Sequence, residues 1–215
     1  MFKSIVSALA LASAVSAVPA WSPPKSYSLK QLARFDNENG VPLVAVAPID
    51  IYLDIKWNGM SLAETLIDST VPGIVPNTPK NYAAYAVPDT ATITQGQPAM
   101  TVNYPDSTIS SFSLRSFYYG CSIAAETSVT AVPTTCTVTI TGKDANGKTL
   151  KTQSFKYDPK GALSAQMMKA SVSGFDTMYS VEFDTTTGNL VTDLLVATVI
   201  DTVDYTVYGA NPIPN

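Results

Sequence analysis

Paired acidic residues are the first groups in this sequence that could do chemistry, because two carboxylates can serve as acid and base in glycoside hydrolysis. Glu182 and Asp184 lie two positions apart, or about 6.7 Å along a strand, near the lower limit for an inverting hydrolase. Asp50 and Asp54 share a strand face but lie about 13 Å apart, which is too far. Nothing in the sequence surrounds Glu182 and Asp184 with an apolar pocket, so a solvated outer sheet face is favoured.

Histidine is absent from the whole chain. Its absence excludes Ser-His-Asp and Cys-His catalysis, zinc sites with histidine ligands and histidine-braced copper sites. The sequence also lacks a G-x-S-x-G nucleophile elbow and a Gly-rich phosphate loop, both of which carry common activities. We therefore expect a protein that is not an enzyme, with a glycoside hydrolase based on Glu182 and Asp184 as an alternative.

Calcium is the metal that the acidic residues suit best, because it takes six to eight oxygen ligands. Oxygen-bearing side chains gather at residues 36–39, beginning with Asp36. Asp201 has the same parity as the inward-facing residues of the last predicted strand, so its carboxylate needs a partner. The other interpretation is a hydrated turn at 36–39 and an Asp201 that caps a turn or pairs with a lysine. The sequence indicates no other cofactor.

Aromatic residues supply the candidate ligand contacts, since sugar rings stack on exposed aromatic faces. Tyr82 and Tyr85 follow a Pro-rich segment, and Tyr119 ends a run of three aromatic residues. We expect these three side chains to form a binding surface near the loops. The competing interpretation places most of the rings in the core.

Alternating segments indicate the elements that position these groups. Residues 49–57 alternate apolar and polar residues without a break, which predicts one half-buried strand, followed by a turn at Asn58-Gly59. Residues 69–80 carry three prolines and predict a long loop. Residues 136–141 alternate again, and the Asp-Ala-Asn-Gly segment at 144–147 predicts a hairpin to a returning strand at 149–157.

Further strands are predicted at residues 111–121 and 202–208, the latter with Val203, Tyr205 and Val207 on one face. Many short strands at regular spacing with no convincing helix indicate an all-β fold, an antiparallel β-sandwich or jelly roll.

The N-terminus has the pattern of a signal peptide, with Lys3 before a short apolar run and small residues at Val15 and Ala17. We expect cleavage after Ala17, or alternatively after Ala20, and a secreted protein, extracellular or associated with a cell wall. In an oxidising compartment the only two cysteines, Cys121 and Cys136, are expected to pair. The predicted organisation is a signal peptide at 1–17, a leader segment at 18–34, one β-sandwich domain at 35–209 and a C-terminal tail at 210–215.

The charge balance limits the partners. The net charge is −4 and the isoelectric point is near 4.7, which argues against nucleic acid and anionic membranes, because both select basic surfaces. The apolar runs are too short to predict insertion into a membrane.

The order of several segments resembles that of small secreted proteins of filamentous fungi with a pattern similar to galactose-binding-like jelly rolls. The matching pieces are RFDNENG, IKWNGMS, VPNTPKNYAAYA, FSLRSFYYGC, TVTITGKDANGK, GFDTMYSVEF and IDTVDYTVYG, between Arg34 and Gly209. The resemblance implies a sandwich with loops at its ends, an extracellular location and often a structural calcium, but no activity.

These observations predict a secreted, non-catalytic binding module for a carbohydrate or cell-wall polymer. A structural or host-interacting protein with a protein partner is an alternative, for which an exposed apolar patch would be the mark.

Overall fold

The computed structural model describes residues 27–38, 41–42, 47–64, 73–124 and 131–209, so the predicted signal peptide and the tail at 210–215 lie outside it. The elements in chain order are β1 (Tyr27–Ala33), β2 (Val41–Pro42), β3 (Ala47–Tyr52), β4 (Ile55–Glu64), β5 (Gly73–Val75), β6 (Asn81–Ala86), α1 (Thr90–Gln95), β7 (Ala99–Thr101), β8 (Ile109–Ala124), β9 (Ala131–Pro133), β10 (Cys136–Lys143), β11 (Thr149–Tyr157), β12 (Ser164–Gln166), β13 (Met168–Ser171), β14 (Ser180–Thr186), α2 (Leu190–Asp193) and β15 (Val196–Gly209).

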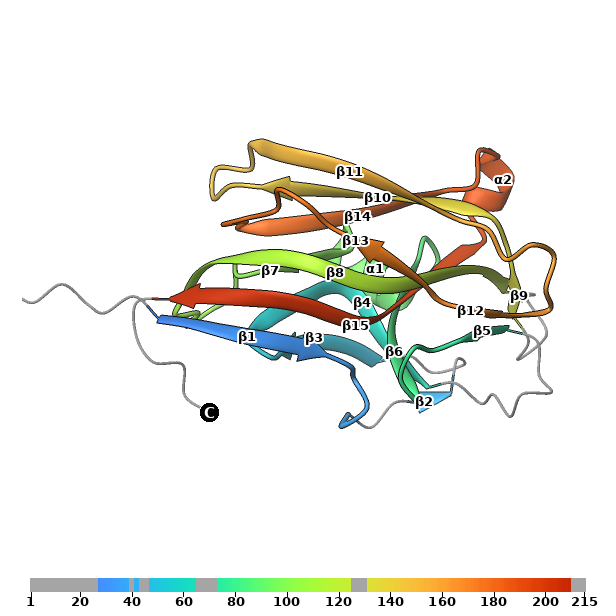
Figure 1. Ribbon diagram of the computed structural model, residues 1–215, viewed down its shortest axis with the longest axis horizontal. Helices are drawn as coiled ribbons and strands as arrows, with labels where there is room; N and C mark the ends of the chain where they lie inside the picture. Colours follow the sequence, from blue (N-terminus) through green and yellow to red (C-terminus); the bar gives the residue numbers. More distant parts are fainter. Residues whose placement is uncertain (1–26, 39–40, 43–46, 65–72, 125–130, 210–215) are drawn as a thin grey trace, which may run out of the picture.

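Most of the strands belong to one largely antiparallel sheet that curls into two layers. Hydrogen bonds connect them in the order β11-β10-β14-β7-β4-β6-β15-β8-β13, with β1 on β15, β2 and β3 on β4 and β9 on β8. The short strands β5 and β12 form a separate parallel pair. Figure 1 shows β10, β11 and β14 in one layer and β1, β8 and β15 in the other. The predicted all-β antiparallel sandwich is therefore confirmed.

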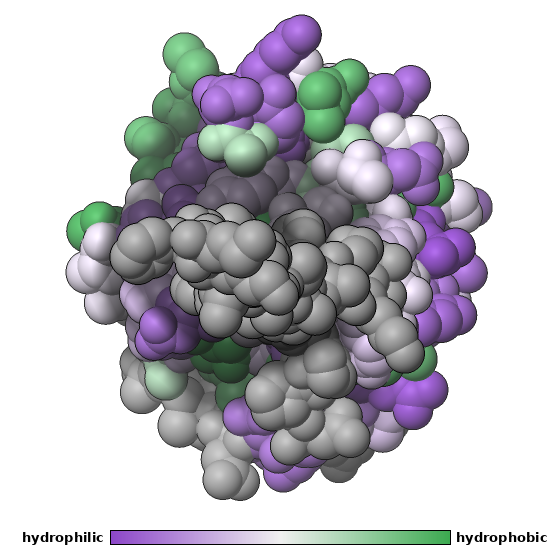
Figure 2. Space-filling model, turned by 90° about the vertical axis from the view of Figure 1, so that its left-hand side faces the viewer, coloured by the Kyte–Doolittle hydropathy of each residue, from purple (hydrophilic) through white to green (hydrophobic). Residues whose placement is uncertain are grey.

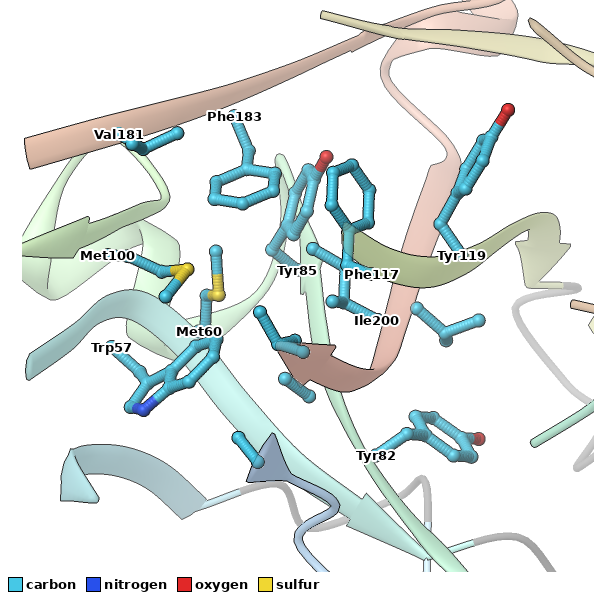
Figure 3. Packing of buried hydrophobic residues seen from close by; sticks show 14 of the residues in the cluster. Trp57, Met60, Tyr82, Tyr85, Met100, Phe117, Tyr119, Val181, Phe183 and Ile200 are labelled. Atoms are coloured by element: carbon cyan, nitrogen blue, oxygen red, sulfur yellow. The ribbon is translucent and has the colours of Figure 1, made fainter. Parts of the chain in front are cut away.

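Aromatic side chains fill the space between the layers. The ring of Phe117 on β8 lies 5.6 Å from Phe155 on β11 and 5.6 Å from Phe183 on β14, centroid to centroid. Figure 3 shows Phe117, Phe183 and Tyr85 gathered in this space. A second group joins Phe35, Trp57 and Tyr205, whose rings lie 5.0 and 6.4 Å apart in edge-to-face contacts. Such contacts add about 0.5–1.5 kcal/mol each beyond the burial of the rings.

The side chain of Gln153 connects the two ends of the curled sheet. Gln153 on β11 donates from Nε2 to the carbonyl oxygen of Ser171 at 3.2 Å and accepts from the Ser173 amide at 3.2 Å. Because β11 and β13 stand at opposite ends of the order of strands, these two bonds draw the curled sheet toward closure.

The predicted hairpin at residues 144–147 is confirmed. It connects β10 to β11, and the Asp144 carboxylate accepts from the amides of Asn146 and Lys148, both at 2.9 Å. Gly147 has a φ of 77°, in the region that favours glycine. The predicted disulfide is also present and joins Cys121 on β8 to Cys136 on β10.

The prediction of one strand over residues 49–57 is wrong. A hairpin interrupts it, because Leu53 and Asp54 both have positive φ, 49° and 65°, and turn the chain between β3 and β4. Tyr52 pairs with Ile55, and both side chains are buried, whereas Ile51 is half exposed. The turn lacks the Asn-Gly or Asp-Gly pair that normally marks this geometry, and the alternation continues across it.

Asn58-Gly59 does not turn the chain but marks where β4 changes neighbours. Up to Asn58, β4 pairs with β7, and from Ser61 onward it pairs with β6. The Asn58 side chain donates to the carbonyl oxygens of Gln95 and Gln97 at 3.0 and 3.1 Å. These contacts hold the C-terminal end of α1 against the strand.

The proposed leader segment at 18–34 is also corrected, because Tyr27–Ala33 form β1 and pair antiparallel with residues 203–209 of β15. Alternation in this stretch (Leu29, Gln31, Ala33) was masked by the preceding prolines. Within the predicted loop at 69–80, residues 73–75 form the short strand β5.

We predict that Gly59→Ala destabilises the fold more than Gly147→Ala. Both glycines have positive φ, 64° and 77°, so both substitutions should cost about 1–2 kcal/mol of backbone strain. A methyl group at position 59 would also lie 2.4 Å from the Gly96 carbonyl oxygen, whereas nothing lies within 4 Å at position 147. The added clash should cost about 1–3 kcal/mol. Urea unfolding of the two variants measures this difference, and equal losses would contradict the close approach of α1 to β4.

Candidate functional site

The three tyrosines expected to contact a ligand are buried in strands. Tyr82 and Tyr85 lie on β6 and Tyr119 lies on β8, with exposed fractions of 4%, 6% and 2%. Burial raises the pKa of Tyr82 and of Tyr119 to about 12, and it raises that of Tyr85 further. The structure therefore does not present these rings as a stacking surface, and the prediction of their role is corrected.

Each tyrosine has a structural role instead. Figure 3 shows Tyr82 apart from Tyr85, because residues three apart on a strand point to opposite faces. The Tyr85 hydroxyl lies 2.8 Å from the Thr185 hydroxyl, which in turn lies 2.7 Å from the Thr198 hydroxyl. Tyr119 packs against Tyr157 at 5.9 Å between ring centroids.

Glu182 and Asp184 lie on the outer face of β14, as the solvated interpretation predicted. Glu182 forms an ion pair with Lys143 on the neighbouring strand at 2.6 Å. Asp184 is exposed and pairs across the sheet with Thr139. Glu182 is paired with Lys143 and does not line the pocket that Asp184 lines, so the two carboxylates do not share the one cleft that the hydrolase alternative requires.

Asp36 and Asp201 come together, although 165 residues of sequence separate them. They meet where β1 ends and β6 begins, since both strands pair with β15 on either side of Asp201. Asp201 is fully buried and accepts from the amide of Thr78 at 2.7 Å and from its hydroxyl at 3.1 Å. Burial raises the pKa of Asp201, and the negative charge of Asp36 raises it further, whereas the bonds from Thr78 and Thr202 oppose the rise.

A third oxygen belongs to this group. Asn81 is fully buried, its amide nitrogen donates to Asp36 at 3.4 Å, and its side-chain Nδ2 donates to the carbonyl oxygens of Phe35 and Glu38. Among the described residues its Oδ1 has no hydrogen-bond partner. Two carboxylates and an amide oxygen are ligands that calcium accepts. The residues present therefore fit the predicted calcium in type, although no group of three or more Asp, Glu, Cys or His side chains converges among the described residues.

A different surface, between α1 and α2, holds a shallow pocket of about 110 Å³. Its apolar lining includes Val87, Pro98 and Phe183, and its polar lining includes Gln97 and Asp184. The two sides of the pocket come from segments far apart in the sequence, 85–98 and 183–196. We call this region the α1–α2 surface.

Exposed apolar side chains lie on both helices that contribute lining residues, Thr92 of α1 and Asp193 of α2. Leu190 and Val191 on α2 are 86% and 70% exposed, and Ile93 on α1 is 68% exposed. The remaining members of the group are Val87, Leu194 and Leu195. Figure 1 shows α2 projecting at one end of the molecule. Figure 2 shows the opposite end, where hydrophilic residues cover much of the described surface and apolar ones form small groups. Exposed apolar side chains of this kind are the feature expected for the alternative of a protein partner.

The turn that carries Leu190 and Val191 is held in place by hydrogen bonds. The Asp193 carboxylate accepts from the hydroxyls of Thr187 at 2.7 Å and Thr186 at 3.0 Å. Asn189 Oδ1 accepts from the Val191 amide at 3.0 Å at the start of α2. The apolar side chains are therefore displayed on an ordered support. Sequence analysis missed this surface, although two apolar pairs after Gly188-Asn189, Leu190-Val191 and Leu194-Leu195, break the alternation of a strand and were its signal.

Comparisons with known proteins give a distant structural similarity. No family model and no curated protein matches the chain. Among solved structures, a DUF4465 family protein from Bacteroides caccae is similar, with a TM-score of 0.48 and 13% sequence identity. The similarity covers 82% of this chain and 98% of that chain. Within the described residues, no helix has the length and apolarity needed to cross a membrane.

We predict opposite pH effects for Asp201 and Asp193. The raised pKa of Asp201 means that the folded state keeps its proton to higher pH, so its contribution to stability is complete below the unfolded pKa and falls as pH rises. Hydrogen bonds from Thr187 lower the pKa of Asp193, so its contribution is present above the unfolded pKa and is lost as pH falls.

Urea unfolding of the wild type, Asp201→Asn and Asp193→Asn between about pH 3 and 7, with EDTA present, tests this pair of predictions. The free energy of unfolding of the wild type minus that of Asp201→Asn should fall as pH rises. The free energy of unfolding of the wild type minus that of Asp193→Asn should rise as pH rises. Parallel curves for the two variants would contradict the assignment.

Proposed function

We propose that the protein is a secreted, non-catalytic binding protein that contacts a partner protein through the α1–α2 surface. The observation that carries this proposal is the exposure of Leu190 and Val191 on a turn held by Asp193 and Asn189. Contact between exposed apolar side chains and water is unfavourable, so burying these side chains against a partner lowers the free energy. An ordered support also lowers the entropy lost on binding.

The size of the pocket supports a large partner over a small ligand. Pockets for drug-sized ligands span about 300–1,000 Å³, whereas this pocket has about 110 Å³. That volume suits one side chain of a partner, with the flanking Leu190 and Ile93 covered by the surrounding contact. The glycan expected from the sequence loses its stacking residues, because Tyr82 and Tyr119 are buried.

Secretion is part of the proposal. A disulfide between Cys121 and Cys136 is the form that cysteines take in an oxidising compartment. The N-terminal segment with the pattern of a signal peptide supplies the route of export.

We predict that the double variant Leu190→Ser/Val191→Ser loses binding to the partner protein. Capture of extracellular proteins on the immobilised wild type provides candidates, and each purified candidate is then titrated against the variants. Removal of two central apolar contacts should cost about 2 kcal/mol, or about thirtyfold in Kd. Leu150→Ser is the matched control, because Leu150 is an exposed leucine on β11 outside this surface.

Pull-down on insoluble chitin, β-glucan, cellulose and xylan forms the second arm. If one of these polysaccharides retains the wild type but not the double variant, the partner is a glycan and not a protein. If no purified partner distinguishes the double variant from the wild type, the α1–α2 surface is not the contact and the proposal fails.

We also propose that Asp36, Asp201 and Asn81 hold a structural calcium that joins β1, β6 and β15. Support comes from the unpartnered Asn81 Oδ1, on a residue whose backbone amide donates to Asp36, and from the charge of Asp36 acting on the buried Asp201. The ion would supply the positive charge that the buried Asp201 needs in its ionised form.

Calcium at about a hundred times its Kd should raise the melting temperature by about 5–10 °C relative to EDTA. Asp36→Asn should remove this shift, and Asp176→Asn, an exposed aspartate in the connection between β13 and β14, should keep it. An unchanged melting temperature of the wild type on addition of calcium would rule the ion out.

A further inference from the structure

The α1–α2 surface is built from segments that carry no basic residue. Lysine and arginine are absent from residues 81–114 and from residues 170–215. Every residue that lines the pocket comes from these two stretches. In sheet register Lys156 on β11 stands two strands away from Thr186, or about 10 Å, and Lys143 on β10 is paired with Glu182.

Acidic side chains accompany the apolar ones. Asp184 and Asp193 both line the pocket, and Asp184 is exposed. Bonds from Thr187 keep the pKa of Asp193 below its usual range, so this carboxylate stays ionised through neutral pH. The surface therefore combines exposed leucine, valine and isoleucine side chains with fixed negative charge.

This combination selects among possible occupants. An anionic membrane would be repelled, because lipid surfaces of that kind attract basic segments. A second copy of this chain would place Asp184 and Asp193 against another acidic surface of a protein with net charge −4, and like charges across a contact oppose association. A partner with apolar side chains and positive charges satisfies both features.

We propose that the α1–α2 surface binds a cationic amphipathic peptide segment, whose apolar side chains cover Leu190, Val191 and Ile93 and whose lysines or arginines face Asp184 and Asp193. This inference rests on the proposed function, since it names the chemistry of the partner for the same surface. The pocket beside Phe183 takes one apolar side chain of the segment. A helix or strand with apolar residues on one face supplies such side chains in a row.

Three synthetic peptides of about 15 residues test the proposal by fluorescence anisotropy, each with the same leucines in a helical pattern. The other positions carry lysine in the first peptide, glutamate in the second and serine in the third. The lysine peptide should bind the full chain at least about ten times more tightly than the other two at low salt. Its affinity should fall steadily between about 0.05 M and 0.5 M NaCl, as screening shortens the reach of charges.

Matched variants separate the two features of the surface. Leu190→Ser/Val191→Ser should weaken the lysine peptide about tenfold or more at every salt concentration. Asp184→Asn should weaken it at low salt and have little effect at high salt, where the charge is screened. Leu150→Ser and Asp176→Asn remove an exposed leucine and an exposed aspartate outside this surface and should leave binding unchanged. The urea midpoint of each variant confirms that it is folded.

Each other outcome overturns the inference in a distinct way. The lysine and serine peptides could bind the wild type equally well and both fail to bind the double variant. That result would show that charge has no role, and the proposed function would still stand. Equal weakening by Asp184→Asn and Asp176→Asn would show attraction to net charge alone. No binding of the lysine peptide would reject the cationic segment, and the capture experiment would then decide the proposed function. Binding to zwitterionic lipid vesicles that requires Leu190 would assign the surface to a membrane.

Discussion

The packing of Phe117 between Phe155 and Phe183 is the contact on which the curled sheet depends. Ladder hydrogen bonds join neighbouring strands only, so they set the order of strands but not how far the sheet curls. Phe117 lies on β8 near one end of the order, and Phe155 lies on β11 at the other end. Full burial of Phe117 and Phe183, at about 1.5–3 kcal/mol each, and partial burial of Phe155 hold the two layers together. The bonds of Gln153 to Ser171 and Ser173 then fix the edges relative to each other.

The sequence predicted the strands whose turns carry recognisable chemistry. The hairpin at 144–147 has Asp and Asn-Gly at the positions that need them, so both β10 and β11 could be located within a residue or two. The turn at Leu53-Asp54 has the same positive φ values without those residues, and tertiary packing of Tyr52 and Ile55 specifies it instead. Local pattern cannot report a turn that only the core stabilises.

The candidate sites also divide into features that a local sequence pattern predicts and features that depend on tertiary structure. The inward parity of Asp201 was predicted correctly, and the structure brings Asp36 near it because β1 ends and β6 begins on either side of Asp201 on β15. The role of Tyr82, Tyr85 and Tyr119 could not be judged from sequence, since a tyrosine on a strand is equally compatible with core and surface. The exposure of Leu190 and Val191 is a tertiary property, and it depends on how Asp193 orders the turn before α2.

The absence of lysine and arginine around the α1–α2 surface also limits which proteases can cut this part of the chain. Proteases with trypsin-like specificity cut after basic residues, and the chain offers them none between Lys80 and Arg115 or after Lys169. Leu190 and Val191 stand on an exposed turn, which is the kind of place where nicking starts. The same composition that gives the surface its negative charge thus denies these enzymes a cleavage site there. Enzymes that cut after leucine or aromatic residues retain cleavage sites there, so proteolysis of this surface depends on that class of protease.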